Sequence, residues 1–420
     1  MQRLFASRTQ WAVGNGFFHS GIIDTDESQS VYVYDCGSIN RPANRAALTR
    51  EIGEFGKQLD LRDAGVDIMF ISHFDEDHVS GIPELTQRVR VTKFVLPMIP
   101  GPDRLLLYSR SLLDRTPGRP IGSFYGSFIT DPDAALRALG ATGVFFIPPT
   151  QPQGGDEGDA GEPLHEERKP IRDIDSDQGN TTAHVDLEIS TKLATISRDG
   201  DVVWEWRYAQ SQQSTSVMKD FAGELVKAGA IAREVDLHDS REIARLVQTR
   251  PADLADAYRL AIRKVGRSFT RNLSSLMLYS GPPVAGWCST LTRRSTACPP
   301  FEDVFVSGDR PGFLGLGDAN LRSKARRAHV NAVFKERKKR VGTFAPAHHG
   351  SHLDWNVSLL DGLGGGSGYR PTLVFSASGA YDHPHLKVLL EANEAGATTK
   401  VVGVEEPSRL TESFAIFYQP

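Results

Sequence analysis

The densest group of metal-binding side chain types in this sequence of 420 residues lies within residues 72–81, which read SHFDEDHVSG. This stretch directly follows the apolar run 66–71, and four of its residues can bind a metal: His73, Asp75, Asp77 and His78. Burying such carboxylates without a countercharge costs several kcal/mol each. A divalent cation removes this cost, because it supplies positive charge and accepts the imidazole lone pairs. The spacing therefore predicts a metal site at a strand end, and the alternative is a solvated loop rich in His and Asp.

Three further groups of candidate residues follow other segments with strand character. Asp318 comes after one apolar run, inside the sequence GLGDA. A second group is PAHHGSH at 346–352, and a weaker third group is His383-Pro384-His385. An aspartate after a strand is common as a turn residue or a helix cap. Asp318 therefore indicates a metal site only in combination with the other groups.

The order of these groups resembles the pattern of the metallo-β-lactamase fold superfamily, which is HxDxDH, then Gly-Asp, then HHGS, then His-Pro. The similarity is greatest to the hydrolase domain of ComEC-type competence proteins, which internalise DNA, and it covers residues 10–100 and 270–405. The resemblance implies an α/β protein with a metallo-β-lactamase-like αββα sandwich and a large middle insertion. It also implies a site for two divalent metal ions between two β-sheets.

By the same resemblance, Asp318 bridges the two metal ions. The implied ligands fall into two sets: Asp77, His78, Asp318 and one histidine of the HHGS motif for one ion, and His73, Asp75 and Asp318 for the other. We favour His349 as the ligand and His348 as a substrate contact or proton donor, and the reverse order stays open.

Two departures from the wider superfamily concern the ion at His73. Asp75 stands where most members have a second histidine, and no Gly-His motif lies between the first group and Asp318. The histidines of that interval lie in sequence contexts that do not suggest a ligand: His165, His184 and His238. This ion is therefore expected to bind weakly or only with substrate. The added carboxylate favours Mn²⁺ or Mg²⁺ in competition with Zn²⁺. His19 and His385 are interpreted as structural.

Two cations that share a water molecule lower its pKa toward about 7, so the expected nucleophile is a metal-bridged hydroxide. The same cations polarise the scissile phosphoryl or carbonyl oxygen. The residues expected to take part in catalysis are Asp77, His348 and His383. The expected substrate contacts are Ser351, His352, Arg322, Lys324 and Arg326.

The substrate prediction depends on the basic segment 322–340, which carries nine Lys or Arg and one Glu shortly after Asp318. A basic segment beside a hydrolytic site favours a nucleic acid or nucleotide as substrate. The alternative for this segment is a solvated helix face without a ligand. We therefore predict a metal-dependent phosphodiesterase or nuclease. Two other functions stay open: a non-catalytic nucleic-acid-binding or regulatory module with a degenerate metal site, and an esterase- or lactonase-type hydrolase.

Composition is that of an ordinary globular protein, with a net charge of −4, 40% hydrophobic residues and 24% charged residues. No stretch approaches the roughly 18 consecutive apolar residues of a membrane span. Three cysteines without CxxC spacing fit a reducing cytosol. We therefore expect a cytoplasmic protein without a membrane partner, and the sequence predicts no particular protein partner.

One hydrolase domain is expected over residues 1–405, with an insertion or cap subdomain at 150–265. Within this insertion, the segment 151–182 loses the periodic pattern and is predicted to be flexible. The RDGD turn at 198–201 predicts a β-hairpin, and 281–300 is interpreted as a turn-rich insertion. Residues 406–420 are expected to form a C-terminal strand that completes the domain.

Overall fold

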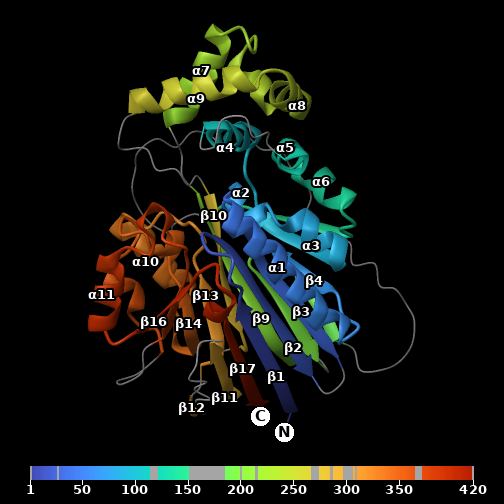
Figure 1. Ribbon diagram of the computed structural model, residues 1–420, viewed down its shortest axis with the longest axis vertical. Helices are drawn as coiled ribbons and strands as arrows, with labels where there is room; N and C mark the ends of the chain where they lie inside the picture. Colours follow the sequence, from blue (N-terminus) through green and yellow to red (C-terminus); the bar gives the residue numbers. More distant parts are fainter. Residues whose placement is uncertain are drawn as a thin grey trace.

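Two β-sheets pack face to face and carry helices on their outer faces, as Figure 1 shows for the computed structural model. The residues that the structure describes are 2–25, 28–113, 122–150, 185–198, 201–212, 216–265, 274–283, 287–296, 306–307, 310–364 and 371–418. The first and last strands pair antiparallel, with Gln2 opposite Tyr418. Both ends of the described chain therefore lie side by side, at the end of the sandwich away from the upper helices in Figure 1.

The first sheet is parallel from β3 to β6, and its other described strands pair antiparallel. Its order across the sheet is β12 (Val306–Ser307), β11 (Trp287–Thr296), β17 (Leu410–Tyr418), β1 (Gln2–Gln10), β2 (Gly16–Thr25), β3 (Gln29–Ser38), β4 (Val66–Phe70), β5 (Val91–Pro97) and β6 (Gly143–Ile147). β4 lies inside the parallel part, and its apolar sequence VDIMF suits a strand that is covered on both faces. The strand predicted at 66–71 is therefore present as β4.

The second sheet is antiparallel from β7 to β13 and parallel from β13 to β16. Its order is β16 (Thr398–Val402), β15 (Thr372–Ser376), β14 (Val341–Ala345), β13 (Gly312–Gly315), β10 (Ser274–Gly281), β9 (Asp201–Gln212), β8 (Leu193–Arg198) and β7 (Val185–Ile189). The predicted hairpin is the β8–β9 pair. Its aromatic side chains alternate along β9 and are all buried between the sheets: Trp204, Trp206 and Tyr208.

Helices cover the outer face of each sheet. The outer face of the first sheet carries α1 (Pro42–Asp60) and α3 (Ile82–Arg88), and that of the second carries α10 (Lys324–Val333) and α11 (Leu386–Glu394). α1 has proline at its first position, where no hydrogen-bonded N–H is needed, and it buries Leu48, Ile52, Phe55 and Leu59 at helical spacing. No helix in the described ranges is long and apolar enough to span a bilayer.

A further group of helices forms a cap above the upper ends of the strands in Figure 1. Its members come from two separate parts of the chain: α4 (Gly101–Leu113), α5 (Ser123–Thr130), α6 (Pro132–Ala138), α7 (Ser216–Lys227), α8 (Ser240–Thr249) and α9 (Pro251–Val265). Apolar residues of this cap, such as Phe221 and Leu254, continue the core cluster that lies under α1. The cap is therefore packed onto the layer outside the first sheet.

Three clusters of buried apolar side chains hold the two sheets and the two helical layers together. One fills the space between the sheets and includes Phe70, Trp206 and Leu276. The other two lie outside the sheets, one around Phe55 under α1 and one around Phe344 under α10 and α11. Two packed sheets with a helical layer on each side confirm the predicted α/β class and the αββα sandwich.

The middle of the chain is divided between the sandwich and the cap. Within the predicted insertion 150–265, β7 to β9 belong to the second sheet, whereas α7 to α9 belong to the cap. The segment 151–182, predicted to be flexible, lies outside the described residues. The interpretation of 281–300 as a turn-rich insertion is wrong for Trp287–Thr296, which forms β11. This strand pairs with β17, a partner more than a hundred residues away that no local pattern reveals.

Candidate metal centre

The candidate metal centre lies where strands of both sheets end. In the first sheet, β4 leads into the first motif, whose second half forms the one-turn helix α2 (Glu76–Val79). In the second sheet, β13 leads to Asp318, and β14 leads to the 3₁₀ turn η4 (Ala347–Gly350). Because β13 and β14 are parallel neighbours, Asp318 and η4 lie side by side, and His348 N donates a hydrogen bond of 2.9 Å to Gly317 O. The structure therefore places three sequence-distant motifs together.

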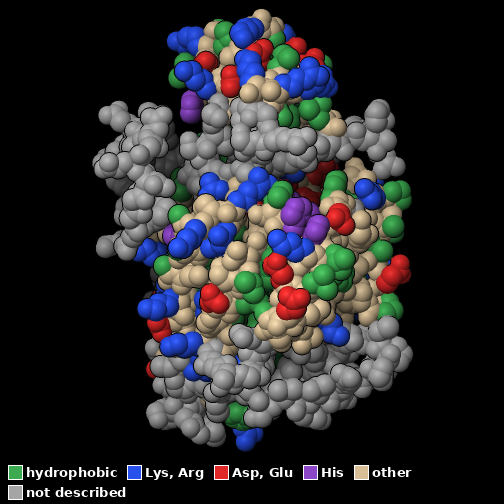
Figure 2. Space-filling view, turned by 90° about the vertical axis from the view of Figure 1, so that its left-hand side faces the viewer, with side chains coloured by type: hydrophobic (Ala, Val, Ile, Leu, Met, Phe, Trp, Pro, Cys, Tyr) green, Lys and Arg blue, Asp and Glu red, His purple; other side chains and the backbone are tan. Residues whose placement is uncertain are grey.

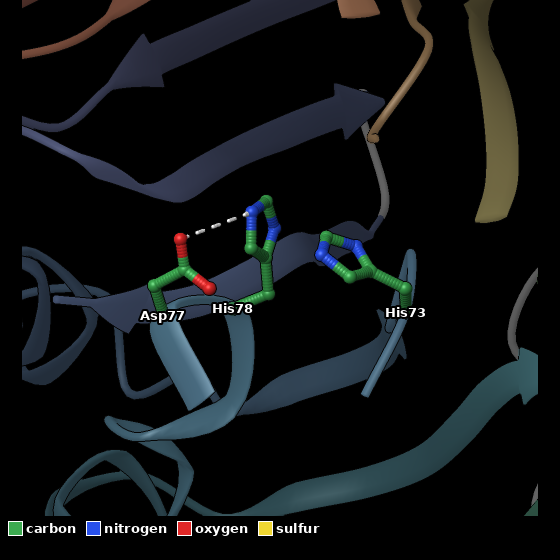
Figure 3. A group of neighbouring side chains, drawn as sticks. All are labelled: His73, Asp77 and His78. Atoms are coloured by element: carbon green, nitrogen blue, oxygen red, sulfur yellow. Dashed lines mark ion pairs between the residues drawn. The ribbon is translucent and has the colours of Figure 1, made fainter. Parts of the chain in front are cut away.

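Two imidazoles and two carboxylates form the first ligand set. His78 Nε2 lies 4.0 Å from Asp77 Oδ2 and 3.8 Å from Asp318 Oδ1. His349 Nε2 lies 3.8 Å from Asp77 Oδ2 and 4.0 Å from the same oxygen of Asp318. Figure 3 shows Asp77 and His78 facing one another from α2. These four side chains come from three segments. Three of them, His78, Asp318 and His349, form a group that could hold a metal ion, and Asp77 forms another such group with His73 and His78.

The second ligand set uses the other oxygen of Asp318. His73 Nε2 lies 3.6 Å from Asp318 Oδ2 and 3.8 Å from Asp75 Oδ2. Donor atoms of these three residues all lie within 4.8 Å of one another. The rings of His73 and His78 are neighbours, with centroids 3.9 Å apart (Figure 3). Asp318 therefore presents one oxygen to each set, as a carboxylate does when it bridges two cations.

The spacing of the donors shows that they fit metal ions. Their separations of 3.6–4.0 Å exceed ordinary hydrogen-bond lengths. They are close to the roughly 3.4 Å between two ligands of a tetrahedral ion whose bonds measure about 2.1 Å. The Nε2 atoms of His73, His78 and His349 are buried and have no hydrogen-bond partner in the described part of the chain. Three orphaned imidazole nitrogens aimed at carboxylates are explained by cations that accept their lone pairs.

Groups behind the imidazoles hold them in this orientation. Asp35 Oδ2 lies 2.8 Å from His78 Nδ1 and accepts a hydrogen bond of 2.6 Å from Ser72 Oγ. The same hydroxyl lies 2.8 Å from His73 Nδ1. With Nδ1 engaged, Nε2 of each ring is left to face the carboxylates. Asp35 was not predicted as a site residue, and its one signal in the sequence is a carboxylate directly after the apolar run VYVY.

Two glycines allow the backbone of the centre to pack closely. A Cβ at Gly37 would lie 2.6 Å from Asp77 O, so α2 rests directly on the end of β3. Gly317 has a φ of +53°, and a Cβ there would lie 2.4 Å from Ser275 Oγ and 2.8 Å from Ser72 Cβ. Any side chain at either position would therefore push the motifs apart.

Burial and charge shift the pKa values of the metal-free centre in opposite directions. Burial, with the neighbouring His78, lowers the pKa of His73 to about 3. Burial also acts to lower the pKa of His78, but Asp35 and the other carboxylates outweigh it and raise this pKa to about 10. Burial raises the pKa of Asp75 to about 6, although Arg110 acts against it. Without a cation, His78 is therefore protonated at neutral pH, and a metal ion must displace this proton.

Negative charge exceeds positive charge in and around the centre. Five carboxylates lie in it or directly behind it: Asp35, Asp75, Asp77, Asp318 and Asp354. Of these, Asp77 is the one that is not buried, with a side chain that is 23% exposed. Arg110 contacts Asp75, and Arg322 lies 3.8 Å from Asp354. Two arginines offset part of the charge of five acids, and bound cations would offset the rest.

The remaining predicted histidines lie at the rim of the centre. His348 Nε2 is 3.8 Å from Asp318 Oδ2, and the His383 ring follows with its centroid 5.4 Å from that of His348. Burial and the neighbouring His348 lower the pKa of His383 to about 4, so this imidazole is neutral at pH 7. His352 is exposed and pairs with His385, with ring centroids 4.3 Å apart. Figure 2 shows histidine side chains grouped on the face that α10 and α11 form, with Lys and Arg side chains around them.

The predicted substrate contacts other than His352 lie near the start of α10 and after η4. Arg322 Nε lies 3.8 Å from Asp354 Oδ1. Lys324 is exposed and Arg326 is half-buried in the first turn of α10, and Ser351 is buried directly after η4. Positive charge therefore lies next to the centre on the side of the second sheet.

Among the residues that the structure describes, the histidines outside these motifs do not belong to the two ligand sets. His19 is buried in β2 and stacks on Phe313, with ring centroids 4.0 Å apart. His238 is exposed at the end of η1 (Glu234–His238). His165 and His184 lie outside the described residues. The two ligand sets are therefore built from the motifs themselves.

Comparison with known proteins gives a family match over the first metal motif. Residues 17–168 match the Metallo-beta-lactamase superfamily. The matched part runs from β2 past β6 and includes the whole first metal motif, and proteins of this superfamily are generally metal-dependent hydrolases. Among solved structures, that of unliganded yeast PDE1 is similar over 99% of this chain and 100% of that chain, with 8% identity and a TM-score of 0.39, a likeness too low to support an argument. A comparison with curated proteins gives no match. The closer resemblance to ComEC-type proteins stays a prediction.

Arg110 connects the cap to the first metal motif, and the sequence did not predict it. Its Nη1 lies 2.9 Å from Asp75 Oδ2, and its side chain is 19% exposed. The surrounding sequence of α4, LLLYSRSLL, reads as an apolar helix with one arginine and gives no sign of this contact. The charge of Arg110 therefore offsets part of the negative charge that Asp75 brings to the second ligand set.

Replacing Arg110 with glutamine is expected to weaken metal binding at His73 and Asp75 in a pH-dependent way. Loss of the arginine removes the group that holds the pKa of Asp75 down, so this pKa rises above about 6. A protonated carboxylate does not bind a cation, so the affinity of this set for Mn²⁺ should fall about tenfold near neutral pH and recover about two pH units higher.

Calorimetric titration at both pH values measures this effect. Arg137→Gln is the matched control, because it removes an arginine of the cap helix α6 that lies at the surface, where it contacts Asp133 and Thr142 O. An equal loss of affinity at both pH values would contradict the explanation by proton competition.

Chelation is expected to destabilise the folded protein. An ion that binds only the folded chain and is present at 100 times its dissociation constant adds about 2.7 kcal/mol to the free energy of unfolding. Thermal unfolding followed by tryptophan fluorescence should therefore start at a lower temperature in EDTA than in excess Mn²⁺ or Zn²⁺. His349→Ala, which lacks one ligand, should show a smaller difference. Identical curves for the unaltered protein would mean that no ion is bound.

Proposed function

We propose that this protein is a metal-dependent phosphodiesterase that acts on a nucleic acid or nucleotide, with two ions of Zn²⁺ or Mn²⁺ and with Mg²⁺ as a further candidate. The observation that carries the proposal is the position of Asp318, whose two oxygens face two separate sets of donors. Two ions bound there supply an activated water nucleophile and positive charge for the transferred phosphoryl group.

In this proposal, some residues of the centre hold the metal ions and others contact the substrate. His78 and His349 hold one ion together with Asp77, and His73 and Asp75 hold the other. Among the acidic ligands of these sets, Asp77 is the most exposed, so it borders the side from which water and substrate reach the centre. His383 lies at the rim and, as a neutral imidazole, can donate a hydrogen bond to a substrate oxygen.

The cations around the centre support a phosphodiester over a carbonyl ester. Arg110 reaches the centre from the cap, and Arg322 lies beside Asp354 on the side of the second sheet. Lys324 and Arg326 extend this charge along the start of α10. A phosphodiester carries a negative charge in its ground state, whereas a carboxylic ester or lactone does not. Positive charge from two sides therefore favours binding of the phosphodiester.

An activity screen with matched substrates tests the proposal. The protein is stripped with a chelator, reloaded with Mn²⁺ or Zn²⁺ and assayed with bis-p-nitrophenyl phosphate, single-stranded DNA, RNA and p-nitrophenyl butyrate. We expect metal-dependent cleavage of the phosphodiesters. Asp77→Asn, which keeps the size of the side chain but removes its charge, should lower this activity at least about 100-fold. His238→Ala, at an exposed histidine of the cap, is the control.

The substrates separate the alternatives. Hydrolysis of the butyrate ester alone would identify a carbonyl hydrolase of the esterase or lactonase type. Binding of nucleic acid without turnover in any metal would identify a non-catalytic module. Cleavage of bis-p-nitrophenyl phosphate without cleavage of either polymer would restrict the substrate to nucleotides or other small diesters.

A further inference from the structure

The two ligand sets differ in their number of imidazoles. The set at Asp77 contains His78 and His349, which lie 4.0 and 3.8 Å from Asp77 Oδ2. The group of Asp75 and Asp318 contains His73 as its one imidazole. An ion in the second set would therefore have one nitrogen ligand and two carboxylates from these residues. The neighbourhood of this set contains one more imidazole, that of His348.

His348 lies beside the second set and faces it through the shared carboxylate of Asp318. Its Nε2 lies 3.8 Å from Asp318 Oδ2, the same oxygen that His73 Nε2 faces at 3.6 Å. The next residue, His349, faces the opposite oxygen, Oδ1, at 4.0 Å. The two consecutive histidines therefore lie on the two sides of the bridging carboxylate.

The backbone of η4 creates this arrangement. His348 and His349 both have a φ of +52°, a left-handed conformation that is strained for a residue other than glycine. Two such residues in succession send their rings apart, with centroids 6.4 Å from one another and planes at 72°. Hydrogen bonds from His348 N to Gly317 O and from Ser351 N to His348 O fix the turn. The strain is therefore maintained by the surrounding structure and serves to direct both imidazoles toward Asp318.

A buried carboxylate orients the His348 ring. Asp354 Oδ2 lies 3.4 Å from His348 Nδ1, and its other oxygen accepts a hydrogen bond from Leu321 N. Asp354 is 5% exposed and so has little freedom to move. The same relation exists at His78, whose Nδ1 is held by Asp35 while its Nε2 faces the donors. A carboxylate on one ring nitrogen with the other nitrogen aimed at carboxylates is the arrangement of a metal-bound histidine.

We propose that His348 Nε2 is a ligand of the metal ion held by His73, Asp75 and Asp318. This inference rests on the metal centre of the proposed function and changes the role expected for His348 from proton donor to ligand. Each ion then has four protein ligands, two of them imidazoles in both sets, and Asp318 is shared. The histidine that the sequence lacks between the first motif and Asp318 is thus supplied by the residue next to a ligand of the other ion.

Metal stoichiometry tests this inference independently of activity. Stripped protein is titrated with Mn²⁺ by calorimetry, and its metal content is measured by mass spectrometry after gel filtration. The unaltered protein should bind two equivalents. His348→Ala should bind one equivalent tightly and the second at least about 100-fold more weakly, and the magnetic coupling between two Mn²⁺ ions should disappear from its electron paramagnetic resonance spectrum. His383→Ala, at the neighbouring rim histidine, should still bind two.

A second variant keeps the inference testable if His348→Ala does not fold. Asp354→Asn leaves His348 in place but removes the charge on its Nδ1, and it should weaken the second ion about 10–100-fold. Circular dichroism of both variants shows whether they fold. If His348→Ala folds and binds two ions as tightly as the unaltered protein, the inference is overturned and His348 is a substrate contact. If the unaltered protein binds two ions but cleaves no phosphodiester, the proposed function fails while the ligand assignment stands. If it binds none, both fail.

Discussion

Asp318→Asn is expected to abolish binding of both metal ions and to reduce phosphodiester hydrolysis at least about 10³-fold, which corresponds to roughly 4 kcal/mol of transition-state stabilisation. The reason is that Asp318 faces both ligand sets, Oδ1 toward His78 and His349 and Oδ2 toward His73. An amide keeps the shape of the side chain but cannot offer two anionic oxygens. Metal content by mass spectrometry and kcat/KM with bis-p-nitrophenyl phosphate measure the two effects.

Comparison with two other variants makes the result specific. Asp77→Asn removes a ligand of one set only, so it should leave about one ion bound, where Asp318→Asn leaves none. Asp361→Asn changes an exposed carboxylate at the end of the 3₁₀ turn Val357–Leu360 and should leave metal content and rate unchanged. Retention of both ions in Asp318→Asn would show that this carboxylate does not bridge them, and the proposed centre would have to be abandoned.

The sequence was informative about this centre because each motif directly follows a strand. The residues after β4, β13 and β14 are the ones that a strand-end argument singles out. The roles of Asp35 and Asp354 were not predicted, because neither residue directly follows a strand. Asp35 lies within β3, and Asp354 follows η4 by four residues, so neither stands at a strand end. Their function depends on which imidazole nitrogen they reach, and that is a property of the assembled fold.

The fold class was predictable, and the cap was only partly so. Strand β4 has a clear apolar pattern and appears close to the predicted limits 66–71, and α1 buries apolar residues at helical spacing. No element was predicted from the sequence for the residues of α4. The cap was predicted to lie entirely within residues 150–265. The cap nevertheless includes α4 to α6. Helices α4 and α5 pack against α8 and α9, which are remote in the sequence, and α6 packs against α5. Arg110 reaches Asp75 only as a result of that packing.

One physical requirement follows from the arrangement of the motifs. His73 to His78 belong to the first sheet, whereas Asp318 and η4 belong to the second. Ligands that must approach within a few ångströms are therefore carried by two separate sheets. Any contact that fixes one sheet against the other contributes to the geometry of the centre, even far from the metal ions.

Arg8 makes such a contact, and Arg8→Ala is expected to lower the free energy of unfolding by about 3–5 kcal/mol. Arg8 lies in β1 opposite Glu412 of β17, and its Nε donates a hydrogen bond of 2.8 Å to that carboxylate. Its Nη2 donates to Thr343 Oγ1 in β14 of the second sheet, and the Thr343 hydroxyl donates to Glu412 at 2.6 Å. Arg8 is 6% exposed and Glu412 is 1% exposed. Removal of the arginine leaves a buried carboxylate without its countercharge.

Urea unfolding followed by tryptophan fluorescence measures this change, with Arg62→Ala as the control. Arg62 pairs with Asp24 at the surface at 3.4 Å, and such pairs contribute at most about 1 kcal/mol. The double variant Arg8→Met with Glu412→Leu removes both charges and should be more stable than Arg8→Ala, because no buried charge is left alone. If Arg8→Ala costs no more than Arg62→Ala, the apolar cluster between the sheets holds them in place by itself. If it costs the expected amount and also weakens Mn²⁺ binding, the ion pair positions the two halves of the metal centre.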